Sequence, residues 1–142
     1  MNPDKNRPAG GKSPAKLRDT DYYVLGGGRL GEAVARRLRE QGYDAGVVTT
    51  TYDSPAVPGL RADPASPTAL ERAGVPDAAA VLVTVRSDKR GFLVAQRVRT
   101  RFEVPRIIVL SSAPDRMDLF EDAGHEAVCA TSALSEALVE NV

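Results

Sequence analysis

Residues 22–31 read Tyr-Tyr-Val-Leu-Gly-Gly-Gly-Arg-Leu-Gly, a short apolar run followed by the pattern Gly-x-Gly-x-x-Gly. The apolar run has the length of a strand, and the stretch from Arg29 to Gln41 that follows it has helical periodicity. Its expected buried stripe consists of Leu30, Ala33, Val34 and Leu38. A glycine turn between a strand and a helix is typical of nucleotide-binding α/β domains.

The three glycines of the pattern have different expected roles. Gly26 permits the tight turn, Gly28 lets the backbone approach a pyrophosphate, and Gly31 lets the helix pack closely on the strand. The helix N-terminus offers free N–H groups, and Arg29 adds a cation for phosphates. The alternative is a turn that only joins a strand to a helix, but the flanking elements favour phosphate binding. The predicted phosphate site is Gly26, Gly27, Gly28, Arg29, Leu30 and Gly31.

Further along the chain, short β-branched or apolar runs alternate with helical stretches, as in a parallel sheet covered by helices. The predicted strands are Tyr22–Gly26, Ala45–Thr50, Leu60–Ala62, Val81–Val85, Ile107–Leu110 and Ala127–Ala130. The helices after the first are Ser66 to Gly74, Ser87 to Arg101, Pro114 to Gly124 and Ser132 to Asn141. Pro55 and Pro58 indicate that no helix joins the second and third strands.

Right-handed crossovers then predict an α/β fold, a Rossmann-type doubly wound parallel sheet of about six strands with helices on both faces. The expected strand order is 3-2-1-4-5-6. A ligand is expected in the crevice between strands one and four, at the carboxyl edge of the sheet.

The length of 142 residues predicts a single domain over residues 21–142, preceded by a disordered basic tail over residues 1–20. Equal numbers of basic and acidic residues, 19 of each, favour no nucleic-acid partner.

No apolar stretch approaches the roughly 20 residues of a membrane span, and no secretory signal is recognisable. Cys129 and His125 are the only residues of their kinds, which predicts no disulfide, no metal site and no histidine-based triad. We therefore expect a cytoplasmic protein without catalytic residues.

The position that usually binds the adenosine ribose carries a hydroxyl. In the usual fingerprint an Asp or Glu about 20 residues after the first glycine ends the second strand. Thr49 stands there, Thr50 and Thr51 follow, and Asp53 is the nearest acid. Hydroxyls or a shifted carboxylate are therefore expected to meet the ribose. No Lys or Arg lies beside Thr49 in the sequence to neutralise a 2′-phosphate, so NAD(H) is the first expected ligand, with ATP, ADP, AMP or NADP(H) as alternatives.

Five segments in order resemble the N-terminal nucleotide-binding domain of the Trk potassium-uptake regulators, the TrkA-N or RCK family. They are the glycine turn, Ala62-Asp63-Pro64-Ala65 with the following Leu70 to Val75, Asp77 to Thr84, Ser87-Asp88, and Phe120 to Val128. The resemblance spans Tyr22 to about Leu138, and the order and spacing of the segments carry it. The chain departs from the family pattern at Thr49, Ala62, Gly91 and Leu110, where an acid, a glycine, an asparagine and an arginine are usual.

The resemblance implies three further site residues. Asp63 would lie against the adenine or its ribose, Thr84 would line the pocket at the end of the fourth strand, and Arg86 would reach a phosphate. Equally weighted alternatives are a turn residue before Pro64 for Asp63 and a solvated loop charge for Arg86.

The resemblance also implies a regulatory domain that controls a membrane potassium transporter or channel from the cytoplasm, at the inner face of the membrane, and that forms a homodimer or a higher homo-oligomer. The apolar stripe Ala133, Leu134, Ala137 and Leu138 would either pair two domains or cover the edge of the sheet. Two other functions stay open: an NAD(P)-binding subunit of an oxidoreductase that needs a catalytic partner chain, and a degenerate dimerisation module without a ligand.

Overall fold

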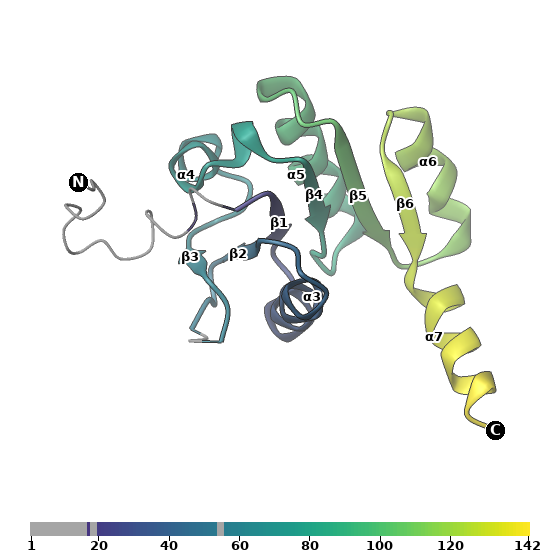
Figure 1. The fold of residues 1–142 in the computed structure, drawn as a ribbon. Coiled ribbons are helices and arrows are strands. Elements are labelled where there is room, and N and C mark those ends of the chain that lie inside the picture. The colour runs from purple at the N-terminus through teal and green to yellow at the C-terminus, as the bar shows by residue number, and fades with distance from the viewer. Residues whose placement is uncertain (1–16, 18–19, 54–55) are drawn as a thin grey trace.

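One sheet of six parallel strands organises the chain, and its order is β3-β2-β1-β4-β5-β6, as predicted (Figure 1). The computed structural model describes Leu17, residues 20–53 and residues 56–142. The strands are β1 (Tyr22–Leu25), β2 (Ala45–Thr49), β3 (Gly59–Arg61), β4 (Ala80–Val83), β5 (Arg106–Ser111) and β6 (Glu126–Cys129). Every adjacent pair is parallel, which confirms the doubly wound Rossmann-type α/β fold.

Helices cover both faces of the sheet. The α-helices of the described residues after Thr20 are α3 (Gly28–Glu40), α4 (Pro67–Ala73), α5 (Asp88–Arg101), α6 (Met117–Asp122) and α7 (Ala130–Glu140), and two 3-10 turns are η2 (Val75–Asp77) and η3 (Pro114–Arg116). The Ser66 side chain caps α4 and the Ser87 side chain caps α5 by accepting backbone N–H groups of the first turn. The predicted helix from Pro114 to Gly124 is divided into η3 and α6.

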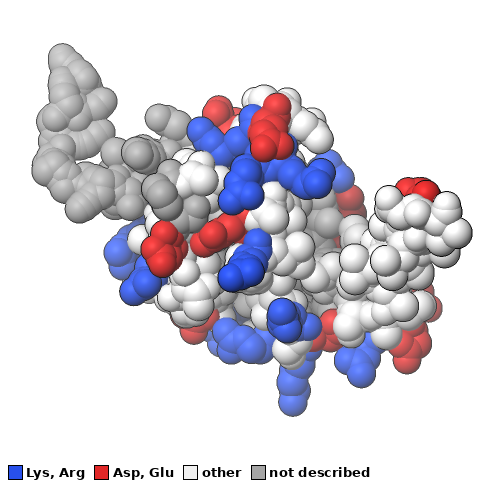
Figure 2. All heavy atoms as spheres, turned by 90° about the horizontal axis from the view of Figure 1, so that it is seen from below, with Lys and Arg blue, Asp and Glu red and all other residues white. Residues whose placement is uncertain are grey.

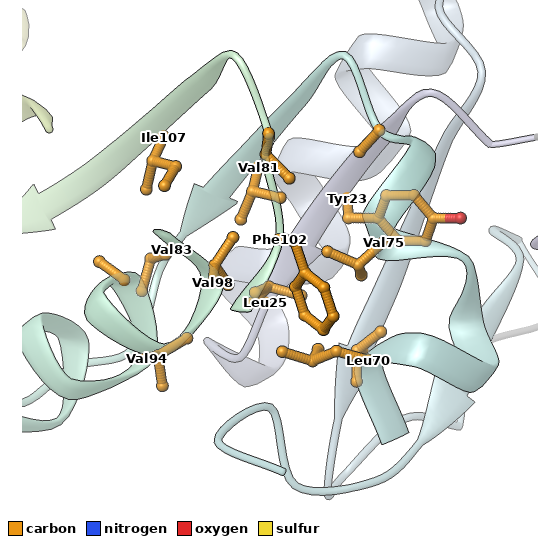
Figure 3. Packing of buried hydrophobic residues seen from close by; sticks show 14 of the residues in the cluster. Tyr23, Leu25, Leu70, Val75, Val81, Val83, Val94, Val98, Phe102 and Ile107 are labelled. Atoms are coloured by element: carbon orange, nitrogen blue, oxygen red, sulfur yellow. The ribbon is translucent and has the colours of Figure 1, made fainter. Parts of the chain in front are cut away.

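The larger core lies on the face covered by α4 and α5. Val94, Ala95 and Val98 occur at helical spacing on α5 and pack with buried residues of β1 and β4. Figure 3 shows side chains from these elements and from α4 converging around Phe102. On the opposite face α3 packs over β1 and β2 through Ala35, which joins a smaller core.

The rotation of α3 differs from the prediction. Gly31 and Ala35 are its buried residues, whereas Val34 and Leu38 are only partly buried. Leu30, predicted to face the core, is 47% exposed. The prediction of a buried four-residue stripe was therefore wrong at Leu30. The close contact of Gly31 with the glycine turn fixes which side of α3 faces the sheet.

The packed domain extends back to Leu17. Residues 1–16 and 18–19 of the predicted tail lie outside the described residues, but Leu17 and Thr20 are described and both are buried. The Tyr23 hydroxyl oxygen lies 2.8 Å from the Leu17 carbonyl oxygen and 2.7 Å from the Ala73 carbonyl oxygen, so its one proton is shared between these two acceptors. The predicted boundary at residue 20 is therefore too late.

Two other expectations concern the ends of strands. The described part of the link between β2 and β3, residues 50–53 and 56–58, contains no helix, as predicted, although Pro55 lies outside the described residues. The alternative that α7 covers the sheet edge is wrong, because none of its residues is buried and Leu138 is 72% exposed. In Figure 1 α7 extends away from the rest of the domain.

His125 is buried between α5 and α6 with one of its two nitrogens unpaired. Its Nε2 lies 2.8 Å from Gln96 Oε1, while Nδ1 has no hydrogen-bond partner among the described residues. Burial lowers the pKa of His125, and the positive charge of Arg99 lowers it further. The folded protein therefore favours the neutral imidazole.

We expect acid to destabilise the fold through His125. Below pH 6.5 the unfolded chain binds a proton at this residue while the folded chain does not, so the stabilisation is complete above that pH and is lost as the pH falls toward the folded-state pKa. The slope contributed by one proton is at most about 1.4 kcal/mol per pH unit. Urea unfolding between about pH 7 and about pH 5 measures it. His125→Gln should flatten the dependence, and identical slopes for both proteins would contradict the assignment.

Candidate nucleotide-binding site

A pocket of about 450 Å³ opens at the carboxyl edge of the sheet, where the chain leaves β1, β2 and β4. This is the crevice that the strand order predicted. Its lining residues are Gly26, Gly27, Gly28, Arg29, Leu30, Thr49, Thr50, Thr51, Pro64, Thr84, Val85, Arg86 and Arg90. The fold thus brings together segments that begin near residues 26, 49, 64 and 84 of the chain.

The glycine turn presents free backbone donors to this pocket. Gly27 is the N-cap of α3, and no side chain caps the helix there. Within the described residues, the N–H groups of Gly27, Gly28 and Arg29 donate to no acceptor, whereas Gly26 N donates to Val48 O at 2.8 Å. Free N–H groups at a helix N-terminus, with the positive end of the helix dipole, bind phosphate groups.

Backbone geometry explains why glycine occupies the turn. A Cβ on Gly27 would overlap the Thr84 side chain, at a φ of +89° that disfavours other residues. A Cβ on Gly28 would meet nothing nearer than Thr51 Oγ1 at 4.0 Å, so this position leaves open space in the pocket. Gly31 lies against the Gly26 carbonyl, which confirms its predicted role in close packing.

Thr84 lines the pocket, as the resemblance implied, and also holds the turn. Its hydroxyl donates to Gly26 O at 2.8 Å, and its backbone N donates to Leu25 O at 3.1 Å. The hydroxyl proton is therefore engaged, and only the oxygen lone pairs remain for a ligand. Thr84, which directly follows β4, thus holds the glycine turn that follows β1.

The ribose side of the pocket carries hydroxyls. Thr49 is buried at the end of β2, and its Oγ1 lies 3.4 Å from Thr51 Oγ1 and accepts from Thr51 N at 3.4 Å. Thr50 and Thr51 are exposed at the rim. Asp53, the nearest acid in the sequence, does not line the pocket. Thr49, Thr50 and Thr51 all belong to the lining, where hydroxyls were expected to meet the ribose.

Asp63 lies outside the lining and is engaged in local contacts. Its Oδ1 accepts from Ala65 N at 2.9 Å, the geometry of a turn residue, and from Arg90 Nη2 at 3.3 Å. Arg90 does line the pocket, although its position in the first turn of α5 gave no signal in the sequence. Arg86 also lines the pocket and makes no ion pair within the described residues.

The pocket has a positive electrostatic character. Arg29, Arg86 and Arg90 line it, and none of the described Asp or Glu residues does. Figure 2 looks from below Figure 1, the direction in which β4 and β6 end, and shows Lys and Arg side chains interspersed with Asp and Glu side chains on this side of the molecule. Over the described part of the chain, no group of three His, Cys, Asp or Glu residues is arranged to hold a metal ion. An anionic ligand fits this environment.

A doubly wound parallel sheet with a glycine turn, a free helix N-terminus and a pocket at the switch point defines the Rossmann-type class of nucleotide-binding domains. Within this class the chain belongs to the TrkA-N domain family, whose sequence model matches residues 22–131. The resemblance read from the five segments is thereby confirmed.

Solved structures share this fold at low sequence identity. The NAD(P)-binding domain of an exopolyphosphatase-related protein from Archaeoglobus fulgidus is 22% identical, with a TM-score of 0.73 over 86% of this chain and 96% of that one. GsuK bound to ADP is 20% identical, with a TM-score of 0.71 over 88% of this chain and 34% of that one. The Kef CTD from Shewanella denitrificans in its AMP-bound form is 20% identical, with a TM-score of 0.67 over 83% and 79%. No curated protein sequence matches.

Proposed function

We propose that this chain is a regulatory domain that binds an adenine nucleotide and thereby controls a membrane potassium transporter or channel from the cytoplasmic side. The observation that carries the proposal is the set of N–H groups at Gly27, Gly28 and Arg29, which have no acceptor within the described residues and belong to a pocket lined by arginines. The ligands of structural neighbours support it, since GsuK is seen with ADP and with NAD and the Kef CTD with AMP. These neighbours support an adenine nucleotide without selecting NAD(H), ADP or AMP.

A sensor role follows from where such a ligand would lie. It would touch the glycine turn after β1 and the residues after β4 and β2 at once, so its binding energy depends on how these segments are placed. That dependence is what couples ligand binding to a conformational change. We propose that the domain acts through this coupling and not as an enzyme. None of the helices in the described ranges is both long and apolar enough to cross a membrane.

We expect one or more adenine nucleotides to raise the unfolding midpoint of the purified chain. The panel is NAD, NADH, NADP, NADPH, ATP, ADP and AMP, and a ligand at about 100 times its Kd adds roughly 2.7 kcal/mol. Gly28→Asp should abolish the shift, because a carboxylate would occupy the open space beside the free N–H groups. Thermal unfolding followed by circular dichroism measures the effect.

A matched control separates the pocket from backbone strain. Gly42 also has a positive φ, +96°, and a Cβ there would meet nothing within 4 Å. Gly42→Asp should therefore lose stability through strain and keep the ligand response. No shift with any nucleotide would sink the proposal and favour the degenerate dimerisation module. Consumption of NADH or NADPH with a partner chain would favour the oxidoreductase subunit.

We propose that α7 joins two copies of the chain. Leu134, Leu138 and Val139 of α7 and Val128 of β6 are exposed, which leaves apolar surface at one end of the domain. In Figure 2 the projecting α7 consists mostly of uncharged side chains. Burying about 1,200 Å² or more between two copies would make such a surface a stable interface.

Light scattering should give the mass of a dimer for the purified chain. Leu134→Glu should shift the mass toward the monomer, because it places a charge in the apolar interface. Ser135→Glu adds the same charge about 100° around the helix and should leave the dimer intact. A monomeric wild-type chain would contradict the homodimer while leaving nucleotide binding unaffected.

A further inference from the structure

We propose that the pocket selects adenine nucleotides that carry a phosphate on the ribose 2′-oxygen, the class to which NADP(H) belongs. The inference rests on the proposed function, since it names the ligand class of the same site. It reverses the expectation of NAD(H), which depended on finding no Lys or Arg beside Thr49 in the sequence.

The end of β2 is where the fold places the adenosine ribose. In sheets of this order an Asp or Glu there binds the 2′-hydroxyl of NAD, whereas a nearby arginine accommodates the 2′-phosphate of NADP. Thr49 ends β2 and lines the pocket, and no carboxylate of the described residues lines it. Asp53 and Asp63 both lie outside the lining, and Asp63 is engaged with Ala65 N and Arg90. No acid in the lining is therefore available to bind two ribose hydroxyls or to repel a 2′-phosphate.

The sheet supplies the missing cation from the neighbouring strand. Arg61 of β3 lies outside the pocket lining, but it is the Cα partner of Thr49, which does line the pocket, in the parallel ladder. Its Nε donates to Tyr52 O at 3.2 Å, which holds the guanidinium beside the turn that follows β2. Its two terminal nitrogens make no hydrogen bond or ion pair within the described ranges, so their N–H groups remain for an anion.

Hydroxyl groups complete this end of the pocket. Thr49 and Thr51 lie 3.4 Å apart through their hydroxyl oxygens, and Thr50 and Thr51 are exposed at the rim. Hydroxyls donate to phosphate oxygens without adding charge. Arg29 is a cation of the pocket lining, and the α3 turn reaches the same region, since a Cβ on Gly28 would lie 4.0 Å from Thr51 Oγ1. A doubly charged 2′-phosphate fits this surrounding better than a neutral hydroxyl does.

Matched ligand pairs isolate the 2′-phosphate. Adenosine 2′,5′-bisphosphate differs from AMP only by this group, and NADPH differs from NADH in the same way. A hydrogen bond between charged groups contributes enough to give about 10- to 100-fold tighter binding. We expect the 2′-phosphorylated member of each pair to bind the full chain that much more tightly in titration calorimetry.

Two variants, Arg61→Met and Thr51→Asp, test the residues proposed to select the 2′-phosphate, and Arg101→Met is the control. Arg61→Met should remove the preference and leave the affinity for AMP and NADH unchanged, while Arg101→Met, on the exposed end of α5, should keep the preference. Thr51→Asp should also remove the preference by placing a carboxylate at the exposed rim, and it leaves Arg61 intact in case the first variant fails to fold.

The outcomes separate this inference from the proposed function. AMP and NADH binding as tightly as their 2′-phosphorylated counterparts, or more tightly, would overturn the inference and leave the regulatory nucleotide domain in place. No binding of either pair would overturn both. A preference for the 2′-phosphorylated ligands that persists unchanged in Arg61→Met and in Thr51→Asp would show that the 2′-phosphate does not bind at this end of the pocket.

Discussion

Gly31→Ala should destabilise the domain by about 3 kcal/mol, the upper part of the range for forcing an extra methyl group into a packed site. A Cβ at Gly31 would overlap the backbone carbonyl oxygen of Gly26 and would lie 3.3 Å from Thr84 Oγ1. Backbone cannot move aside as a flexible side chain can, so α3 must shift away from β1. The same shift would displace the free N–H groups of the turn, so nucleotide-induced stabilisation should be lost as well.

Gly91→Ala is a closely matched control for this prediction. Gly91 is the fourth residue of α5, as Gly31 is the fourth residue of α3. A Cβ at Gly91 would meet Val109 at 3.7 Å and Val83 at 3.9 Å, which are ordinary contacts. Alanine is favoured over glycine in a helix by about 1 kcal/mol, so this variant should be as stable as the wild type or more so. Equal urea midpoints for the two variants would contradict the close approach at Gly31.

Leu17→Ala should cost about 2–5 kcal/mol, the range for removing a buried leucine side chain from a core. Leu17 is 0% exposed and packs in the larger core, and its carbonyl accepts the Tyr23 hydroxyl at 2.8 Å. The free energy of unfolding in urea measures this cost. A leucine in a disordered tail would show almost none.

Leu119→Ala provides the comparison for Leu17. Leu119 is 55% exposed on α6, so truncating it removes little buried surface and should change the free energy of unfolding by less than about 0.5 kcal/mol. If the two leucine variants unfold at the same urea concentration, Leu17 does not belong to the core.

Local patterns predicted most of the fold. The helix predicted from Ser87 to Arg101 runs from Asp88 to Arg101 in the structure, with Ser87 as its N-cap. The short helix after Ser66 follows the same rules, with Pro67 at its start and Gly74, at a φ of +100°, after its end. Such signals lie within a few residues of the element they define, so one sequence suffices to read them.

Predictions failed where a residue's environment comes from distant parts of the chain. Leu30 fits a helical apolar stripe, but the contact between Gly31 and Gly26 rotates it toward the pocket. Leu17 stands in a polar, proline-rich segment, yet Tyr23 and Ala73 bring their elements against it. The stripe on α7 has the pattern of a core helix, although no part of the described chain covers it.

The sequence by itself determined the glycine turn, the strand order and the edge of the sheet that carries the pocket, because each follows from short-range periodicity and from the handedness of crossovers. Only the tertiary structure decided which charges meet there. Helix packing brought Arg90 of α5 to the pocket, and the parallel pairing of β2 and β3 set Arg61 beside Thr49. In both cases the residues that meet are separated along the chain. Electrostatic complementarity acts through space over a few ångströms, so the choice of ligand depends on these contacts.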